Sequence, residues 1–166
     1  LQKIIINLNG EFIECPVGGS TKPARDGKLL GLVGGDKKTF DKIEYLLKFI
    51  CRRYEYLGDV GKGTSMKLAV NLPLMVYWQA LGEAISIATN SGIQFEKALD
   101  IMMDSSGAAK VAHLKLNSII QAMNNETNLP STFNASSSLK DMKLMVEEGN
   151  KNGNNLHVIN SAIYYM

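Results

Sequence analysis

The chain has 166 residues, of which 45% are hydrophobic and 20% charged, as in an ordinary folded globular protein. Eighteen Lys and Arg against 16 Asp and Glu leave a formal charge of +2. The basic residues are scattered along the chain, so no nucleic-acid partner is expected. No run of about twenty apolar residues could span a membrane. Cys15 and Cys51 lie in no metal-ligand spacing, so we expect free thiols in a reducing compartment and no metal site.

The first sixty residues alternate between strand and helix patterns, which is typical of an α/β sheet. Residues 1–9 fit the end of a helix or a short strand equally well. They start without an initiator Met, as if an element were already under way. The other elements predicted here are a strand at 11–15, a glycine-rich loop at 17–23, a short helix or turn at 24–26, a strand at 29–33, a helix at 39–53 capped by Thr39, and a strand at 54–57.

After Gly63 the pattern is helical only. The apolar-rich segment 64–89 predicts a long helix that Pro73 kinks or breaks, because proline removes one backbone hydrogen bond. Further helices are predicted at 94–103, 108–123 and 136–148, with a last one from 158 to 166. We therefore expect an α/β part over residues 1–60 and an all-helical domain over residues 61–166.

Lys67 and Asn71 are the first candidates for a polar active site. They follow a turn with three glycines between 58 and 63 and lie four residues apart, so they project from one helix face. A solvated lysine near a helix start is the simpler alternative. A phosphate-binding P-loop is excluded, because Thr64 rather than a lysine follows Gly63.

The loop Gly18, Gly19 and Ser20 is the second candidate site. Consecutive backbone N–H groups next to a hydroxyl can hold a carboxylate or a phosphate, although an ordinary turn has the same composition. His113 and His157 have no carboxylate or cysteine at ligand or triad spacing, which argues against a metal site and against a nucleophilic triad.

Five stretches then occur in a fixed order. They are Phe12 to Ser20, Ala24 to Leu29 with Val33 to Asp36, Gly61-x-Gly63-x-x-x-Lys67-x-x-x-Asn71, Gly82-Glu83-Ala84, and Phe133 with Lys140-Asp141-Met142. Together they resemble the β-hydroxyacid dehydrogenase family, which includes 3-hydroxyisobutyrate dehydrogenase, tartronate semialdehyde reductase and glyoxylate/succinic semialdehyde reductases.

The resemblance implies roles for single residues. Lys67 would be the general acid/base, Asn71 would hold substrate and lysine in register, and Gly18, Gly19 and Ser20 would grip the substrate carboxylate. Lys140 and Phe133 would contact the cofactor, NAD or NADP. The family's serine is Gly18 here, and its second asparagine is Leu72, which leaves the choice of substrate open.

The resemblance also implies a domain organisation. Residues 1–60 would be the C-terminal part of an NAD(P)-binding Rossmann domain whose glycine fingerprint lies upstream of Leu1. Residues 61–166 would be a helical substrate and dimerisation domain, entered by a long interdomain helix and incomplete at its C-terminus. By itself, this 166-residue chain is expected to be inactive.

The resulting hypothesis is an NAD(P)-dependent oxidoreductase that interconverts a β-hydroxyacid and its semialdehyde or keto acid. It would act as a homodimer or homotetramer in the cytoplasm, or in an organelle if a targeting segment lies upstream. Two alternatives stay open: a non-catalytic dimerisation or recruitment module of the same fold, and imine reduction. Relatives of both kinds tend to replace the lysine, so Lys67 argues against them.

Overall fold

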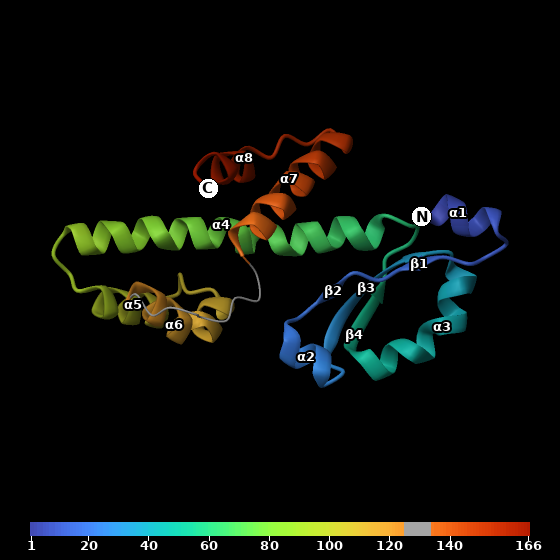
Figure 1. Cartoon of the computed structure of the whole chain (residues 1–166), viewed down its shortest axis with the longest axis horizontal. Coiled ribbons are helices and arrows are strands. Elements are labelled where there is room, and N and C mark those ends of the chain that lie inside the picture. The colour runs from blue at the N-terminus through green and yellow to red at the C-terminus, as the bar shows by residue number, and fades with distance from the viewer. Residues whose placement is uncertain (125–133) are drawn as a thin grey trace. The chain divides into compact units, whose positions relative to one another are not determined.

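The computed structural model describes residues 1–124 and 134–166 (Figure 1). These residues form two compact units, each with its own core. The first comprises Leu1–Leu72 and Glu147–Asn154, and the second comprises Pro73–Val146 and Asn155–Met166. These units are defined by the packing of residues against one another, whereas the boundary predicted at residue 60 separates domains of different function. That boundary stays a prediction.

The first unit is a small mixed sheet with helices. Its elements are α1 (Gln2–Asn7), β1 (Ile13–Glu14), β2 (Val17–Gly18), α2 (Thr21–Arg25), β3 (Leu29–Gly35), α3 (Lys37–Ile50) and β4 (Cys51–Tyr56). Strand β3 is central, since β1 and β2 pair with it antiparallel and β4 pairs with it parallel. The undecided first segment is thus helical. The predicted loop at 17–23 contains β2 and the start of α2, and α2 ends within the short helix or turn predicted at 24–26.

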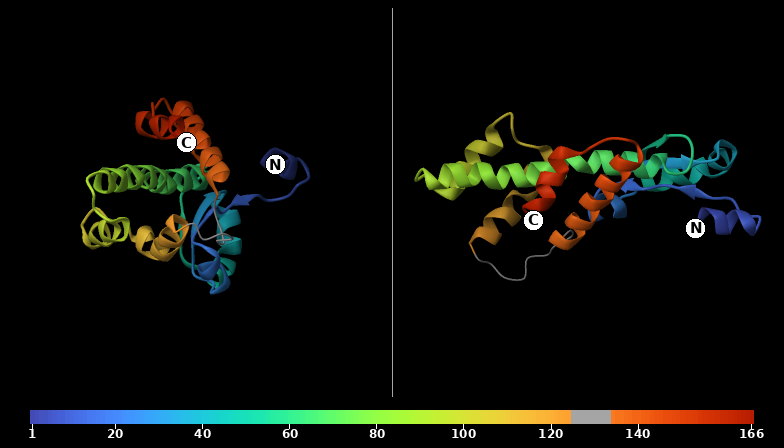
Figure 2. Two further views of the ribbon diagram at one scale, coloured as in Figure 1. Left: turned by 60° about the vertical axis from the view of Figure 1, so that its left-hand side comes forward. Right: turned by 90° about the horizontal axis from the view of Figure 1, so that it is seen from above.

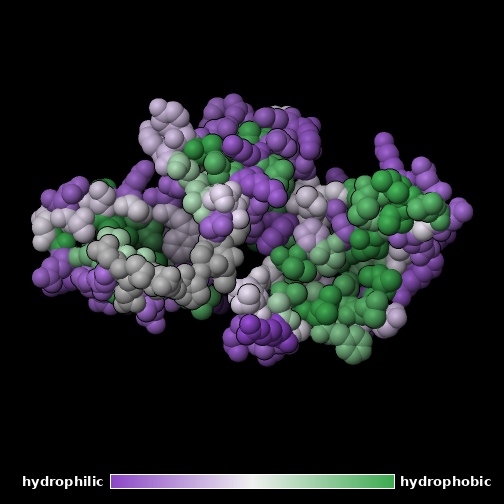
Figure 3. Space-filling view, viewed as in Figure 1, coloured by the Kyte–Doolittle hydropathy of each residue, from purple (hydrophilic) through white to green (hydrophobic). Residues whose placement is uncertain are grey.

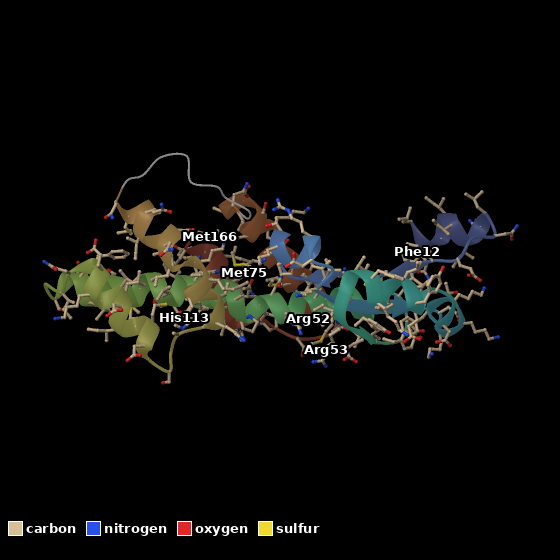
Figure 4. All side chains as sticks on the ribbon, turned by 90° about the horizontal axis from the view of Figure 1, so that it is seen from below. Phe12, Arg52, Arg53, Met75, His113 and Met166 are labelled. Atoms are coloured by element: carbon tan, nitrogen blue, oxygen red, sulfur yellow. The ribbon has the colours of Figure 1, made fainter. Side chains whose placement is uncertain are left out.

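The apolar run of β3 explains its central place. Residues 31–35 are all buried, and Val33 packs with Phe40 and Leu47 of α3 in one hydrophobic cluster. The exposed residues Arg52 and Arg53 lie on β4, which pairs only with β3 in the described part of the chain (Figure 4). Charges on such an edge strand disfavour pairing with other chains.

Two details of α3 correct the sequence-based prediction. The cap is Asp36, whose Oδ1 accepts a hydrogen bond from Thr39 N at 2.9 Å, so the prediction of Thr39 as the cap was wrong. The helix also ends at Ile50 instead of Arg53, because residues from Cys51 onward pair with β3. An aspartate with extended backbone accepts from the third helical residue, which is the standard geometry of an N-cap.

Helix α4 (Lys62–Asn90) is one long helix (Figure 2). Pro73 lies inside it. The break considered at Pro73 is absent. Met75 and Leu81 are buried beyond the proline, and their packing helps to offset the lost backbone hydrogen bond. The helix leaves the first unit after Leu72, so Lys67 and Asn71 both belong to the first unit.

The regular elements of the second unit, within its described residues, are all helices. After the main part of α4 it contains α5 (Phe95–Asp104), α6 (Lys110–Met123), most of α7 (Ala135–Lys151) and α8 (His157–Tyr164). Leu81, Leu99, Met103 and Ala112 form one buried cluster of this unit. The predicted fold class, the end of a Rossmann-type sheet followed by a helical part with one long helix, is confirmed. Among the described helices, none combines the length and the apolar character needed to cross a membrane.

Hydrophobic side chains gather on the surface of the first unit (Figure 3). They include Ile4 on α1, which is 61% exposed, and Phe49 on α3, which is 75% exposed, with Tyr45 at 60% on the same face of α3. Exposed apolar surface of this kind is typical of a region that contacts another polypeptide.

Candidate active site

Lys67 and Asn71 lie side by side on the first turns of α4. Lys67 Nζ donates a hydrogen bond to Asn71 Oδ1 at 3.2 Å, and both residues are partly buried. The helix brings these side chains together because residues four apart lie one above the other on the same face. An ammonium group oriented by an amide oxygen can deliver a proton to an oxygen atom placed beside it.

The glycine turn before α4 is shaped by backbone conformations that favour glycine. Gly58 and Gly61 have φ angles of +103° and +102°, in the region where other residues are strained. Gly35 N donates to Gly58 O at 2.8 Å, so the turn is tied to the end of β3. These glycines therefore let the backbone of the turn pack against the sheet.

Glu14 of β1 is the residue that this turn surrounds. Its Oε1 accepts hydrogen bonds from Gly61 N at 2.8 Å and from Thr64 N at 3.2 Å, and its Oε2 accepts one from Thr64 Oγ1 at 2.9 Å. The carboxylate therefore satisfies backbone donors at the start of α4, where the helix dipole favours negative charge.

Two glycines leave the room that this carboxylate occupies. A Cβ on Gly34 of β3 would lie 2.5 Å from Glu14 Oε1, and a Cβ on Gly63 would lie 3.1 Å from the same atom and 2.4 Å from Leu32 O. Because real Cβ atoms do not approach oxygen so closely, the notch between β1, β3 and α4 requires glycine on two of its sides.

Sequence reasoning assigned no role to Glu14. An acid in a short strand carries no local signal when its partners lie 47 and 50 residues further along the chain. The only available hint was that Glu14 stands within the stretch from Phe12 to Ser20 that resembles a family motif.

A second carboxylate reaches the same helical turn. Ser65 Oγ lies 2.9 Å from Gly61 O and also within hydrogen-bonding distance of Glu148 Oε1, near the end of α7. Glu148 belongs to the short segment of α7 that packs with the first unit. The start of α4 is thus held from β1 by Glu14 and from α7 by Glu148.

The loop of Gly18, Gly19 and Ser20 begins at β2, which pairs with the same central strand, β3, as the strand of Glu14 does. Gly18 ends β2 opposite Leu30, and Glu14 is opposite Gly34, so the loop and the carboxylate are four residues apart along β3, or about 13 Å. Gly19 has a φ of +130°, and a Cβ there would lie 2.9 Å from Leu29 Cδ2. This geometry makes Gly19 difficult to replace.

The remaining candidates are not part of the first unit as the structure describes it. Lys140 is exposed on α7 within the second unit, and Phe133 lies outside the described residues. His113 is exposed on α6 (Figure 4). Within residues 1–124 and 134–166, no group of three or more His, Cys, Asp or Glu side chains could hold a metal ion.

Cys15 and Cys51 are free thiols on either side of β3. A Cβ on Gly31 would lie 3.2 Å from Cys15 Sγ and 3.0 Å from Cys51 Sγ. Both sulfur atoms therefore pack next to the position that a side chain of residue 31 would occupy. Burial raises the pKa of the Cys15 thiol, and the neighbouring Cys51 raises it further, while burial also raises the pKa of Cys51. Neither thiol is therefore suited to act as a nucleophile at neutral pH.

Two family models match the chain. The first, described as NAD-binding of NADP-dependent 3-hydroxyisobutyrate dehydrogenase, matches residues 61–164, more than half of the chain. The second, described as the NAD binding domain of 6-phosphogluconate dehydrogenase, matches residues 2–58. The chain belongs to the β-hydroxyacid dehydrogenase family. Both models describe domains for a nicotinamide cofactor, so the expectation of NAD or NADP is confirmed at the level of the family.

Individual relatives agree with this assignment. Glyoxylate/succinic semialdehyde reductase 1 of Arabidopsis thaliana is 32% identical over 162 residues, which are 98% of this chain and 54% of the relative. A crystal structure of 3-hydroxyisobutyrate dehydrogenase from Salmonella typhimurium matches with a TM-score of 0.81 at 20% identity, over 98% of this chain and 57% of that one, which shows a shared fold.

A relative with a different description also matches. The human cytokine-like nuclear factor N-PAC is 26% identical over 149 residues, which are 90% of this chain and 26% of that protein. The chain spans about half the length of the reductase that it matches.

Proposed function

We propose that the complete protein is an NAD(P)-dependent oxidoreductase that interconverts a β-hydroxyacid and the corresponding semialdehyde or keto acid. Lys67 is its general acid/base. The observation that carries this proposal is the 3.2 Å hydrogen bond from Lys67 Nζ to Asn71 Oδ1 at the start of α4. It lies within the segment that matches the 3-hydroxyisobutyrate dehydrogenase family model.

The chemistry follows from the two side chains. In reduction, Lys67 Nζ gives a proton to the carbonyl oxygen of the substrate, and in oxidation it takes the proton of the hydroxyl group. Asn71 Oδ1 orients the ammonium group, and the amide nitrogen of Asn71 is left to donate a hydrogen bond to the substrate.

The donor set fits a nicotinamide cofactor. An amine and an amide are suited to proton transfer and orientation but cannot themselves carry a hydride, whereas a bound nicotinamide supplies or accepts the hydride at the substrate carbon. We assign Lys140 and Phe133 to contacts with that cofactor on the basis of the family resemblance.

We assign the substrate carboxylate to the loop of Gly18, Gly19 and Ser20. Support comes from the positive φ of Gly19 and from the position of the loop on the same strand as the anchor of α4. Backbone N–H groups of such a loop bind a carboxylate without a bulky side chain in the way. This assignment sets the substrate class as a small acid.

A non-catalytic module of the same fold is the second candidate, because the nuclear factor N-PAC is among the relatives. Under that function, Lys67 and Asn71 would have no role in turnover.

For either function we propose a homodimer or homotetramer, which the exposed side chains of α1 and α3 support. Sedimentation of the complete protein measures the oligomeric state. We place the protein in the cytoplasm or an organelle.

Replacement of Lys67 by alanine tests the proposal. In the complete protein, Lys67→Ala should lower kcat by about 10²- to 10⁴-fold and remove the limb of the pH–rate profile that belongs to the lysine. Lys62→Ala is the matched control, since Lys62 is an exposed lysine on the first turn of the same helix. The assay uses a panel of β-hydroxyacids and aldehyde acids with NAD and with NADP. Turnover by Lys67→Ala equal to that of Lys62→Ala would rule out the assigned role, and absence of turnover in the unmodified protein would favour the non-catalytic module.

A further inference from the structure

We propose that Glu14 is a positioning residue for the active site. By holding the first turn of α4 against β1, it sets where Lys67 and Asn71 project. This inference rests on the proposed function for its catalytic consequence, but the anchoring itself does not depend on that function.

The geometry of the carboxylate supports an anchor instead of a chance surface contact. Glu14 Oε1 accepts from Gly61 N at 2.8 Å and Thr64 N at 3.2 Å, and Oε2 accepts from Thr64 Oγ1 at 2.9 Å. Three hydrogen bonds to one carboxylate constrain both its position and its orientation. Bonds to an ionised acceptor are also shorter and stronger than those between neutral groups.

Backbone approaches the partly buried carboxylate closely on two sides. Gly34 and Gly63 both leave space that a Cβ would take from Glu14 Oε1, at 2.5 Å and 3.1 Å respectively. The strand that carries Glu14 is itself fixed, since Ile13 and Glu14 pair with Gly35 and Gly34. The anchor therefore connects a paired strand to the helix with no flexible segment in between.

Lys67 lies three residues after Thr64, less than one helical turn from the anchored N–H group. A rigid helix transmits a shift or rotation of its first turn directly to the side chains of the next turn. Proton transfer needs the donor within hydrogen-bonding reach of the reacting oxygen, and a displacement of about 1 Å can cost about 100-fold in rate. Glu14 thus affects turnover through Lys67 without touching the substrate.

The test compares three variants of the complete protein. Glu14→Ala removes all three bonds, whereas Glu14→Gln keeps an acceptor for the two backbone N–H groups and a partner for the Thr64 hydroxyl. Glu11→Ala is the matched control, because Glu11 is an acid three residues earlier whose ion pair is with Lys42 on α3.

Two readouts separate the anchor from the catalytic role. Hydrogen exchange of the Gly61 and Thr64 amides should become faster in Glu14→Ala and stay unchanged in Glu11→Ala. At a temperature well below unfolding, kcat should fall by about 10- to 100-fold in Glu14→Ala, with KM for substrate nearly unchanged. In Glu14→Gln, kcat should recover most of this loss.

Unchanged exchange at Gly61 and Thr64 in folded Glu14→Ala would overturn the anchor, whatever the activity. Faster exchange with kcat equal to that of Glu11→Ala would overturn the positioning role. If Glu14→Ala does not fold, Thr64→Val takes its place, because it removes the hydroxyl bond that orients the carboxylate. Unchanged exchange of the Gly61 amide in that variant then overturns the proposal. If the unmodified protein has no turnover, the proposed function fails, while the exchange data still decide on the anchor.

Discussion

Replacing Gly63 by alanine should destabilise the protein, although alanine is normally the better residue inside a helix. Gly63 is the second residue of α4, and a Cβ there would lie 2.4 Å from Leu32 O of the central strand. The same substitution at Gly82, also within α4, meets no atom within 4 Å. The two glycines therefore form a matched pair in one helix.

The two substitutions should change the free energy of unfolding in opposite directions. Alanine is favoured over glycine in a helix interior by about 1 kcal/mol, and Gly82→Ala should gain roughly that amount. At Gly63 the added carbon would be more than 1 Å inside the optimal separation of about 3.5 Å between heavy atoms. Because the clashing atom is a backbone carbonyl of a buried strand, the helix has to move. A clash this short belongs at the upper end of the usual cost of overpacking, about 2–3 kcal/mol, which exceeds the gain in propensity.

Urea and thermal unfolding of the two variants measure this difference. For a chain of this size, 1 kcal/mol corresponds to a change in Tm of about 2–4 °C. Gly82→Ala should raise Tm, and Gly63→Ala should lower it together with kcat, since the displaced turn carries Lys67. A Gly63→Ala variant as stable as Gly82→Ala would show that the glycine turn does not pack against β3 as described.

Two further predictions concern titratable groups. Burial raises the pKa values of Cys15 and Cys51, so in the native state at pH 7–8 both thiols should react with a disulfide reagent more slowly than free cysteine does. In urea they should react at the rate of free cysteine. Equal rates in the native and the urea-unfolded protein would refute this prediction. Hydrogen bonds from Thr39 lower the pKa of Asp36, so its cap stabilises the fold at neutral pH and is lost as the pH falls through that lowered pKa. Asp36→Ala should accordingly lower Tm at pH 7 and much less at pH 3, and an equal loss at both pH values would argue against the cap.

Part of the candidate site could be predicted without the structure, because helix geometry alone relates its residues. The spacing of Lys67 and Asn71 fixes them on one face of any helix, and the side chains are found 3.2 Å apart. The apolar run from Leu29 onward likewise indicated a buried strand, which became the centre of the sheet. Both features depend on residues that are close together in the sequence.

Other features of the first unit were missed for physical reasons. The cap of α3 was assigned three residues too late, because Asp36 and Thr39 are both good capping residues and only the backbone conformation at Asp36 decides between them. The strand within the predicted glycine loop exists because Val17 and Gly18 find partners on β3. The loop composition is compatible with either outcome.

The sequence by itself determined the family, the order of strand and helix segments, and the pairing of Lys67 with Asn71, since each follows from local spacing or from motifs in a fixed order. Only the tertiary structure decided what holds that pair in place. Glu14 meets Gly61 across 47 residues of sequence, through a notch that two glycines from different elements leave open. Such a contact depends on where β1, β3 and α4 come to lie in space, and no local rule of sequence encodes that position.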